Sequence, residues 1–187
     1  MMEEIKKRVK ARLSPHRFAH VEGVAKTAVK LAAIHGIDEK RAELAAWLHD
    51  YYREDSRESL VHLAEEVAFV IGEQPTPLLH GPLMAARLSL DFGIDDSEVR
   101  EAIAVHTIGD PAMGPVAQVL FVADLIEPGR TFASARPVRA VAERDLARAV
   151  AMTADATIEH LLSAHLPIAK ETVALRNLIW KRIDETT

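Results

Sequence analysis

A histidine and an aspartate stand side by side at the end of an apolar stretch, in "LAAWLHDYYRED" over residues 44–55. Imidazole nitrogens and carboxylate oxygens are good ligands for transition metals, and both groups are costly to bury without a partner. Adjacent side chains on a helix diverge by roughly 100°, yet a long imidazole and a short carboxylate can still converge on one ion. Taken alone, the His49–Asp50 pair is more simply a hydrogen-bonded pair at a helix end.

Four further residues of the same two types lie beside apolar residues in separate segments: His20, His80, His106 and Asp124. A single histidine on an apolar helix face is usually a structural residue with a satisfied ring nitrogen. These residues, however, each lie on or at the end of a different amphipathic segment, and apolar faces of different helices point into one interior. Unpaired there, each group would cost about 1–3 kcal/mol. A shared cation removes that cost, so the six residues together predict a metal site.

The elements that must position these residues are helices. Ala and Leu abound, alternating β-branched runs are missing, and Gly or Pro falls mostly at joints between periodic segments. Ser14, Asp38 and Asp95 or Asp96 are suitable N-caps, and Gly36 and Gly93 are suitable helix ends. The pattern predicts these helices: 2–13, 15–35, 39–53, 56–71, 77–92, 96–107 and 115–127, followed by two or three over 137–187 that are interrupted at Pro167. We therefore expect one all-α domain spanning residues 1–187.

Composition narrows the class of protein further. A chain of 187 residues with 49% hydrophobic residues can bury the core of one domain. The formal net charge of −5 argues against a broad nucleic-acid surface. Cysteine is absent, so any metal must be held by His, Asp, Glu and water. The start, "MMEEIKKRVKARL", is too charged for a signal peptide, and "VAQVLFVADLI" is too short to span a bilayer. These features predict a cytoplasmic protein with no membrane segment.

The order His20, His49–Asp50, His80, His106, Asp124 resembles the HD-domain metal-dependent phosphohydrolases, and more closely the YqeK family of symmetrical bis(5'-nucleosyl)-tetraphosphatases. The stretches that carry the resemblance are "HRFAHVEGVAKTA", "AELAAWLHDYYRE", "LLHGPLMAARL", "AIAVHTIGDPAM" and "VLFVADLIEPGR", and more loosely "TIEHLLSAHLPIAKETVALRN". It thus covers most of the chain. Two positions depart from the family, because Arg53 replaces the usual Lys and Ile108 replaces the usual Thr or Ser.

The resemblance implies an HD-domain helical bundle that hydrolyses diadenosine tetraphosphate to two ADP with a metal-activated water. It assigns a first metal to four ligands: His20, His49, Asp50 and Asp124. His80 and His106 either complete a second metal site or donate hydrogen bonds to phosphate. One or two transition metal ions are expected, with iron favoured and manganese or zinc suitable. The expected catalytic residues are Asp50, His80 and His106. The partners implied are a small dinucleotide and, as a further expectation, a second copy of the chain.

Phosphate binding is expected from three arginines and one threonine near the ligands: Arg17, Arg53, Thr107 and Arg130. An Arg fork matches two phosphate oxygens at once. Each arginine also has a plainer interpretation, because Arg17 and Arg53 could be solvated helix-end cations and Arg130 could cap carbonyls at a helix end. Glu127 could support a ligand or be a helix-end acid. Two tryptophans are expected in the core, and five histidines on the surface or in structural roles: Trp47, Trp180, His16, His35, His62, His160 and His165.

Two other functions fit the sequence. One is a different HD-domain nucleotide phosphohydrolase, such as a nucleoside monophosphate phosphatase or a cyclic-nucleotide phosphodiesterase. The other is a nucleotide sensor that keeps the metal residues without turnover. An intact set of ligands argues against the sensor, because pure binding has little need for every group that activates water.

Overall fold

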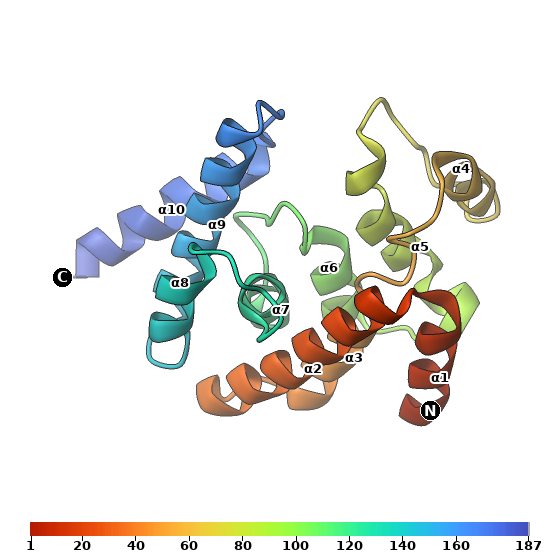
Figure 1. Cartoon of the computed structure of the whole chain (residues 1–187), viewed down its shortest axis with the longest axis horizontal. Coiled ribbons are helices and arrows are strands. Elements are labelled where there is room, and N and C mark those ends of the chain that lie inside the picture. Colours follow the sequence, from red (N-terminus) through yellow and green to blue (C-terminus); the bar gives the residue numbers. More distant parts are fainter. Residues whose placement is uncertain (187) are drawn as a thin grey trace.

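The computed structural model describes residues 1–186, which form helices joined by turns and loops (Figure 1). The helices, with one 3-10 turn η1, are in chain order α1 (Met2–Arg12), α2 (Pro15–His35), α3 (Glu39–Leu48), α4 (Arg57–Glu65), η1 (Thr76–Leu78), α5 (His80–Phe92), α6 (Ser97–Val105), α7 (Pro115–Ile126), α8 (Ala135–Ala142), α9 (Leu146–Ser163) and α10 (Lys170–Thr186). Residues 1–186 contain no strand, which confirms the prediction of an all-α fold. Across the same residues, no helix is both long and apolar enough to cross a membrane.

Helix starts and ends follow the signals expected from the sequence. The side chains of Ser14, Asp38 and Asp96 accept hydrogen bonds from backbone amides of the first turns of α2, α3 and α6. Gly36 and Gly93 end α2 and α5 with φ of 67° and 66°, in the left-handed region that favours glycine. Each cap pairs backbone groups that the helix itself leaves unsatisfied.

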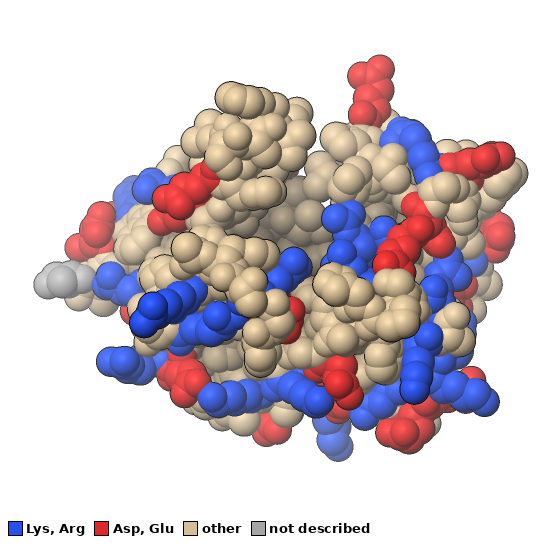
Figure 2. Space-filling model, in the orientation of Figure 1, with Lys and Arg blue, Asp and Glu red and all other residues tan. Residues whose placement is uncertain are grey.

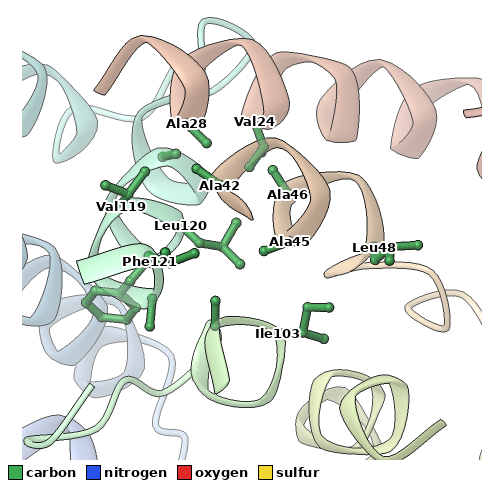
Figure 3. Close-up of a cluster of buried hydrophobic side chains, with 14 of the residues drawn as sticks. Val24, Ala28, Ala42, Ala45, Ala46, Leu48, Ile103, Val119, Leu120 and Phe121 are labelled. Carbon is green, nitrogen blue, oxygen red and sulfur yellow. The ribbon is translucent and has the colours of Figure 1, made fainter. Parts of the chain in front are cut away.

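Helix α7 lies at the centre of the bundle (Figure 1). It contacts α2, α3 and α6 on one side and α8 and α9 on the other, while α10 packs on α9. The core between α2, α3, α6 and α7 is built from small and medium side chains such as Ala28, Ala45, Ile103 and Leu120 (Figure 3). Alanines at these contacts let the helix axes approach closely, so residues at the helix ends are brought to one point.

Two helix ends near the candidate ligands are set by imidazoles. Helix α3 ends at Leu48 rather than near Arg53, and residues 49–54 form turns. The carbonyl of Ala46, which the amide of Asp50 would reach in a continued helix, instead accepts a hydrogen bond from His49 Nδ1 at 2.6 Å. The carbonyl of Ile103 accepts a hydrogen bond in the same way from Nδ1 of His106, which directly follows α6. The expectation that these helices run on to about residues 53 and 107 is therefore wrong.

The turn at residues 49–54 is fixed from outside by a buried arginine. Arg87 of α5 is 5% exposed and donates to both carboxylate oxygens of Asp91, to the hydroxyl of Tyr52 and to the carbonyl of Leu63. The Tyr52 hydroxyl also donates a short hydrogen bond to Asp91. Burial and Asp91 raise the pKa of Tyr52, which keeps the hydroxyl protonated. This network ties the turn that carries Asp50 to α5.

The C-terminal part contains three helices, at the upper end of the predicted number. The interruption at Pro167 is confirmed, because α9 ends at Ser163 and α10 begins at Lys170. The helix expected over residues 56–71 is shorter than predicted and ends at Glu65. The last residue of the predicted C-terminal range, Thr187, lies outside the described residues.

Candidate metal centre and active site

The six side chains expected to bind metal lie together where α2, α3, α5, α6 and α7 meet. Their ligand atoms form three overlapping groups, each within 4.8 Å: His20, His49 and Asp50; His49, His106 and Asp124; and Asp50, His80 and His106. All but Asp124 are buried. Residues up to about 100 positions apart in the chain are thus brought into a single cluster, as the sequence predicts.

Each imidazole of the cluster presents its Nε2 atom to the centre, because its Nδ1 atom is already used. Nδ1 of His49, His80 and His106 lies 2.6, 2.9 and 2.8 Å from the backbone carbonyl three residues earlier. Nδ1 of His20 lies 3.1 Å from Oε1 of Glu127. Carbonyl and carboxylate oxygens only accept hydrogen bonds, so each Nδ1 must donate. The lone pair of every neutral imidazole is therefore on Nε2, as metal binding requires.

Asp50 lies between the imidazoles. Its Oδ1 is 3.1 Å from His80 Nε2, and its Oδ2 is 3.4 Å from His49 Nε2. Asp124 lies beside His20, whose Nε2 is 3.0 Å from Asp124 Oδ1. The two oxygens of Asp50 therefore face different sets of imidazoles. This is the placement expected of a carboxylate that bridges two ions.

The charges of the cluster favour cation binding. Burial opposes the ionisation of Asp50, but the imidazoles of His49 and His80 outweigh it and hold the pKa of Asp50 well below its ordinary value. Burial is likewise outweighed at Asp124, whose pKa is lowered by the adjacent imidazole of His20 and by the charge of His49. Burial also lowers the pKa of His49, but the neighbouring Asp50 raises it by more. Both carboxylates are thus ionised.

The imidazole of His106 is neutral. Burial, together with the neighbouring imidazoles of His80 and His49, lowers the pKa of His106 to about 3. Its Nε2 lies 3.0 Å from Nε2 of His80, although both Nδ1 atoms are donors. Two lone pairs that face each other repel unless a cation or a proton lies between them.

The residues present fit a divalent transition metal. Nε2 of His20 and Nε2 of His49 are buried and have no hydrogen-bond partner. Leaving such atoms unsatisfied costs about 1–3 kcal/mol each, and a bound cation would remove this cost. Imidazole nitrogens with carboxylate oxygens suit iron, manganese and zinc. The donor set therefore supports metal binding without selecting one metal.

The four expected phosphate ligands surround the cluster. A small cavity of about 110 Å³ is lined by Arg17, Arg53, Thr107 and Arg130 together with Asp50, Asp124, His80 and His106. Arg17 Nη1 lies 2.9 Å from Asp50 Oδ2, and Arg130 Nη2 lies 3.0 Å from Asp124 Oδ1. Arg53 Nη1 is 3.3 Å from a backbone carbonyl, and Thr107 Oγ1 is 3.1 Å from His106 Nε2. Two guanidinium groups of this cavity thus each contact one carboxylate of the cluster.

Glu127 is the residue whose role the sequence leaves open and the structure defines. Its side chain is buried, and its second oxygen accepts a hydrogen bond from the amide of Gly129 at 2.6 Å. A Cβ atom at Gly23 would lie 2.5 Å from Glu127 Oε2, so only a glycine in α2 allows the carboxylate to reach His20. Glu127 therefore orients the imidazole of His20. Its sequence signal is the "EPGR" stretch directly after the helix that carries Asp124.

The sequence does not predict some of the residues that line the cavities near the candidate ligands. His160, expected to be a surface or structural residue, lines a cavity beside the cluster together with Phe132 and Thr157. His16 lines a second cavity. His160 and Thr157 follow the polar pattern of an ordinary amphipathic helix along α9, so the sequence does not distinguish them as cavity residues.

The other expectations for histidine and tryptophan agree with the structure. His35 Nε2 lies 2.7 Å from the carbonyl of Ala142, and the exposed His62 pairs with Glu65. Trp47 is buried in the core, and the partly buried Trp180 packs against the core. None of these four belongs to the cluster of candidate metal ligands, so their roles are structural.

A helical bundle that joins histidines and a His-Asp pair at its helix ends is the architecture of the HD domain, and the family model described as HD domain matches residues 17–129. Over 174 residues the chain is 37% identical to the symmetrical bis(5'-nucleosyl)-tetraphosphatase of Halalkalibacterium halodurans, covering 90% of this chain and 91% of the relative. The protein of the same name from Bacillus subtilis is 34% identical, over 90% and 92% of the two chains. The chain therefore belongs to the HD-domain family of symmetrical bis(5'-nucleosyl)-tetraphosphatases.

A solved structure agrees with this assignment. The crystal structure of a predicted HD superfamily hydrolase involved in NAD metabolism from Clostridium acetobutylicum superposes with a TM-score of 0.90. The two chains are 30% identical, and the match covers 97% of this chain and 98% of the other. The fold of the whole chain, including α8 to α10 beyond the matched HD domain model, is thus shared with a relative.

Proposed function

We propose that this protein is a metal-dependent phosphohydrolase that cleaves diadenosine tetraphosphate at its central bridge and releases two ADP. The observation that carries the proposal is the convergence of six metal-ligating side chains between two arginines. Three relatives that the chain matches over about 90% of its length or more have names that state this symmetrical activity. The substrate is a small dinucleotide with several negative charges, which suits the arginines.

His20, His49, Asp50 and Asp124 would hold a first metal ion, and Asp50, His80 and His106 would hold a second. The bound metal would activate a water molecule near neutral pH and neutralise phosphoryl oxygens. Iron is favoured among the suitable metals by the family resemblance. Elemental analysis after desalting should find about one to two equivalents of transition metal, the range for mono- and binuclear sites.

The arginines would position the tetraphosphate. A guanidinium has five N–H donors, and only one donor of Arg17 and two of Arg130 are used in the structure. Once the carboxylates of Asp50 and Asp124 bind cations, these arginines can turn donors toward phosphate. Arg17 and Arg130 would then bind phosphate groups on both sides of the scissile bond. Thr107 and Arg53 would contribute further donors at the same cavity.

The overall reaction fixes where the atoms go. Water attacks one of the two central phosphorus atoms, the bond from that phosphorus to the central bridging oxygen breaks, and a proton is released. Chromatography of an early time point should therefore show ADP as the only nucleotide product. In labelled water, one oxygen should enter the terminal phosphate of one ADP. AMP with ATP from the start, or cleavage of mononucleotides alone, would instead indicate another HD-domain phosphohydrolase.

Two finer expectations belong to the proposal. The protein would act in the cytoplasm on small molecules rather than on nucleic acid, and it would form a homodimer. Cell fractionation and light scattering of the metal-loaded protein test these two points directly.

A further inference from the structure

Two cavities with different linings adjoin the candidate metal ligands. The first, called here the inner cavity, has a volume of about 430 Å³ and lies between α7, α9 and the segment with Phe132; His106 and Asp124 form part of its wall. The second, called here the outer groove, has a volume of about 630 Å³ and lies between α2 and residues 127–132, with His20 in its wall. Arg130 and Phe132 line both. A dinucleotide centred on the metal cluster can thus extend into both.

The inner cavity has the walls of a nucleoside site. Phe121 and Ala156 are buried apolar residues that form its sides, and Thr153 and Thr157 of α9 also line it. Its volume lies in the range of about 300–1,000 Å³ for small-molecule pockets. A planar base can therefore be buried between apolar side chains a short distance from the metal ligands.

Two threonine hydroxyls of the inner cavity can only accept further hydrogen bonds. The hydroxyl of Thr153 donates to the carbonyl of Ala149 at 2.8 Å, and the hydroxyl of Thr157 donates to the carbonyl of Thr153 at 2.9 Å. Each hydroxyl has a single hydrogen, so its remaining capacity is to accept. A base with an exocyclic amino group, such as adenine, supplies the donor that these oxygens lack.

More charged side chains line the outer groove than line the inner cavity. Its walls include Arg17, Lys26 and Arg130, together with Phe132, which also lines the inner cavity. The carboxylate of Glu127 in this wall is already used by His20 and Gly129. The hollow in the face of the molecule drawn in Figure 2 lies instead between α9 and α5, with Lys and Arg side chains along its lower edge. The cationic side chains of the outer groove attract phosphates, and its charged walls match a neutral base less well than Phe121 and Ala156 of the inner cavity do.

We propose that the two halves of the dinucleotide are bound unequally. One adenosine occupies the inner cavity and sets base specificity, while the second nucleoside lies over the outer groove and can be replaced or omitted. This inference rests on the proposed function and goes beyond it. It requires adenosine 5'-tetraphosphate, which has a single nucleoside, to be a substrate that water splits into ADP and pyrophosphate.

The first test compares substrates with the metal-loaded wild-type protein. We expect kcat/KM for adenosine 5'-tetraphosphate to lie within about tenfold of that for diadenosine tetraphosphate, whereas inosine 5'-tetraphosphate, which lacks the amino group, should be at least about tenfold poorer. Cleavage of diadenosine tetraphosphate without cleavage of adenosine 5'-tetraphosphate would overturn the inference. Equal use of the inosine and adenosine compounds would overturn it too. No cleavage of diadenosine tetraphosphate would contradict the proposed function itself.

The second test uses variants of the two cavities. Ala156→Leu fills the inner cavity, and its matched control Ala19→Leu places the same side chain on the wall of the outer groove. We expect a KM increase of about tenfold or more for Ala156→Leu and a smaller one for Ala19→Leu. Equal effects would contradict unequal binding. Because Ala156 is buried, Thr157→Val provides a milder change of similar shape, and it should reduce the preference for adenosine over inosine while thermal melting stays close to wild type. An unchanged preference in that variant would contradict the role of the hydroxyl.

Discussion

Replacing Glu127 with glutamine should weaken metal binding without removing a ligand. The carboxylate accepts hydrogen bonds on both oxygens, from His20 Nδ1 at 3.1 Å and from the amide of Gly129 at 2.6 Å, and it is 4% exposed. Glutamine offers one oxygen and one NH₂ group. If the oxygen faces His20, the NH₂ group meets the amide hydrogen of Gly129. If the amide is flipped, Nδ1 of His20 must become an acceptor and its proton moves to Nε2, which can then no longer bind metal.

Either orientation of the glutamine has a cost that can be estimated. A buried donor left without an acceptor costs about 1–3 kcal/mol. Loss of a partner that orients a ligand typically lowers metal affinity by about 10–100-fold. We therefore expect the Kd for metal to rise by that factor in Glu127→Gln, while the helical content stays unchanged.

Competition with a chromophoric chelator measures the Kd, and circular dichroism reports the fold. Glu143→Gln is the matched control, because Glu143 pairs with Lys30 on the surface, where the side chains are 52% and 62% exposed. That variant should bind metal as the wild type does. If Glu127→Gln also keeps the wild-type Kd, Glu127 serves only the turn at Gly129 and does not orient His20.

Four other changes have expected outcomes. Arg130→Ala should raise KM by the equivalent of about 1.5–3 kcal/mol, the value of a charged hydrogen bond, with metal content nearly unchanged by elemental analysis. Arg87→Met should lower the free energy of unfolding by about 3–5 kcal/mol, because it leaves the carboxylate of Asp91, whose side chain is 11% exposed, without its cation. In the same denaturant titrations, Arg100→Met should lower it by at most about 1 kcal/mol, because Arg100 pairs with Asp95 at the surface. Gly81→Ala should lower the free energy of unfolding by about 1–3 kcal/mol and perturb metal binding. The reason is that the added Cβ atom would lie 2.9 Å from Cε1 of His106. Asp96→Ala removes the N-cap of α6 and should lower the free energy of unfolding by about 0.5–2 kcal/mol at pH 7. The pKa of Asp96 is lowered, because hydrogen bonds from a guanidinium and backbone amides outweigh its burial, so this difference should persist above about pH 4 and shrink as the pH falls further.

The sequence predicts the metal cluster well because each ligand lies next to apolar residues on its own helix. Placing His20, His80 and Asp124 on buried stripes is enough to bring them to one interior, since every stripe must face the core. The helix ends are less predictable. Whether α3 stops at Leu48 depends on which donor takes a backbone carbonyl, and that donor is the His49 imidazole.

The parts of the site formed between distant elements could not be predicted. The contact between His20 and Glu127 joins residues 107 positions apart, and neither residue type reveals the partner. The inner cavity depends equally on how α9 packs beside α7. The hydroxyls of Thr153 and Thr157 follow the ordinary polar pattern of a helix, so their position beside the metal cluster becomes visible only in three dimensions.

The hydrogen bonds that orient the imidazoles have a consequence for the order of assembly. His49, His80 and His106 are oriented by carbonyls three residues away, so each can take its ligand geometry as soon as its own turn forms. His20 depends on Glu127 and therefore on the docking of α2 against the end of α7. During synthesis from the N-terminus, a chain that ends before residue 127 can bind metal only weakly. Full metal affinity would thus appear only after α7 has been made and has docked, which makes metal uptake a measure of completed folding.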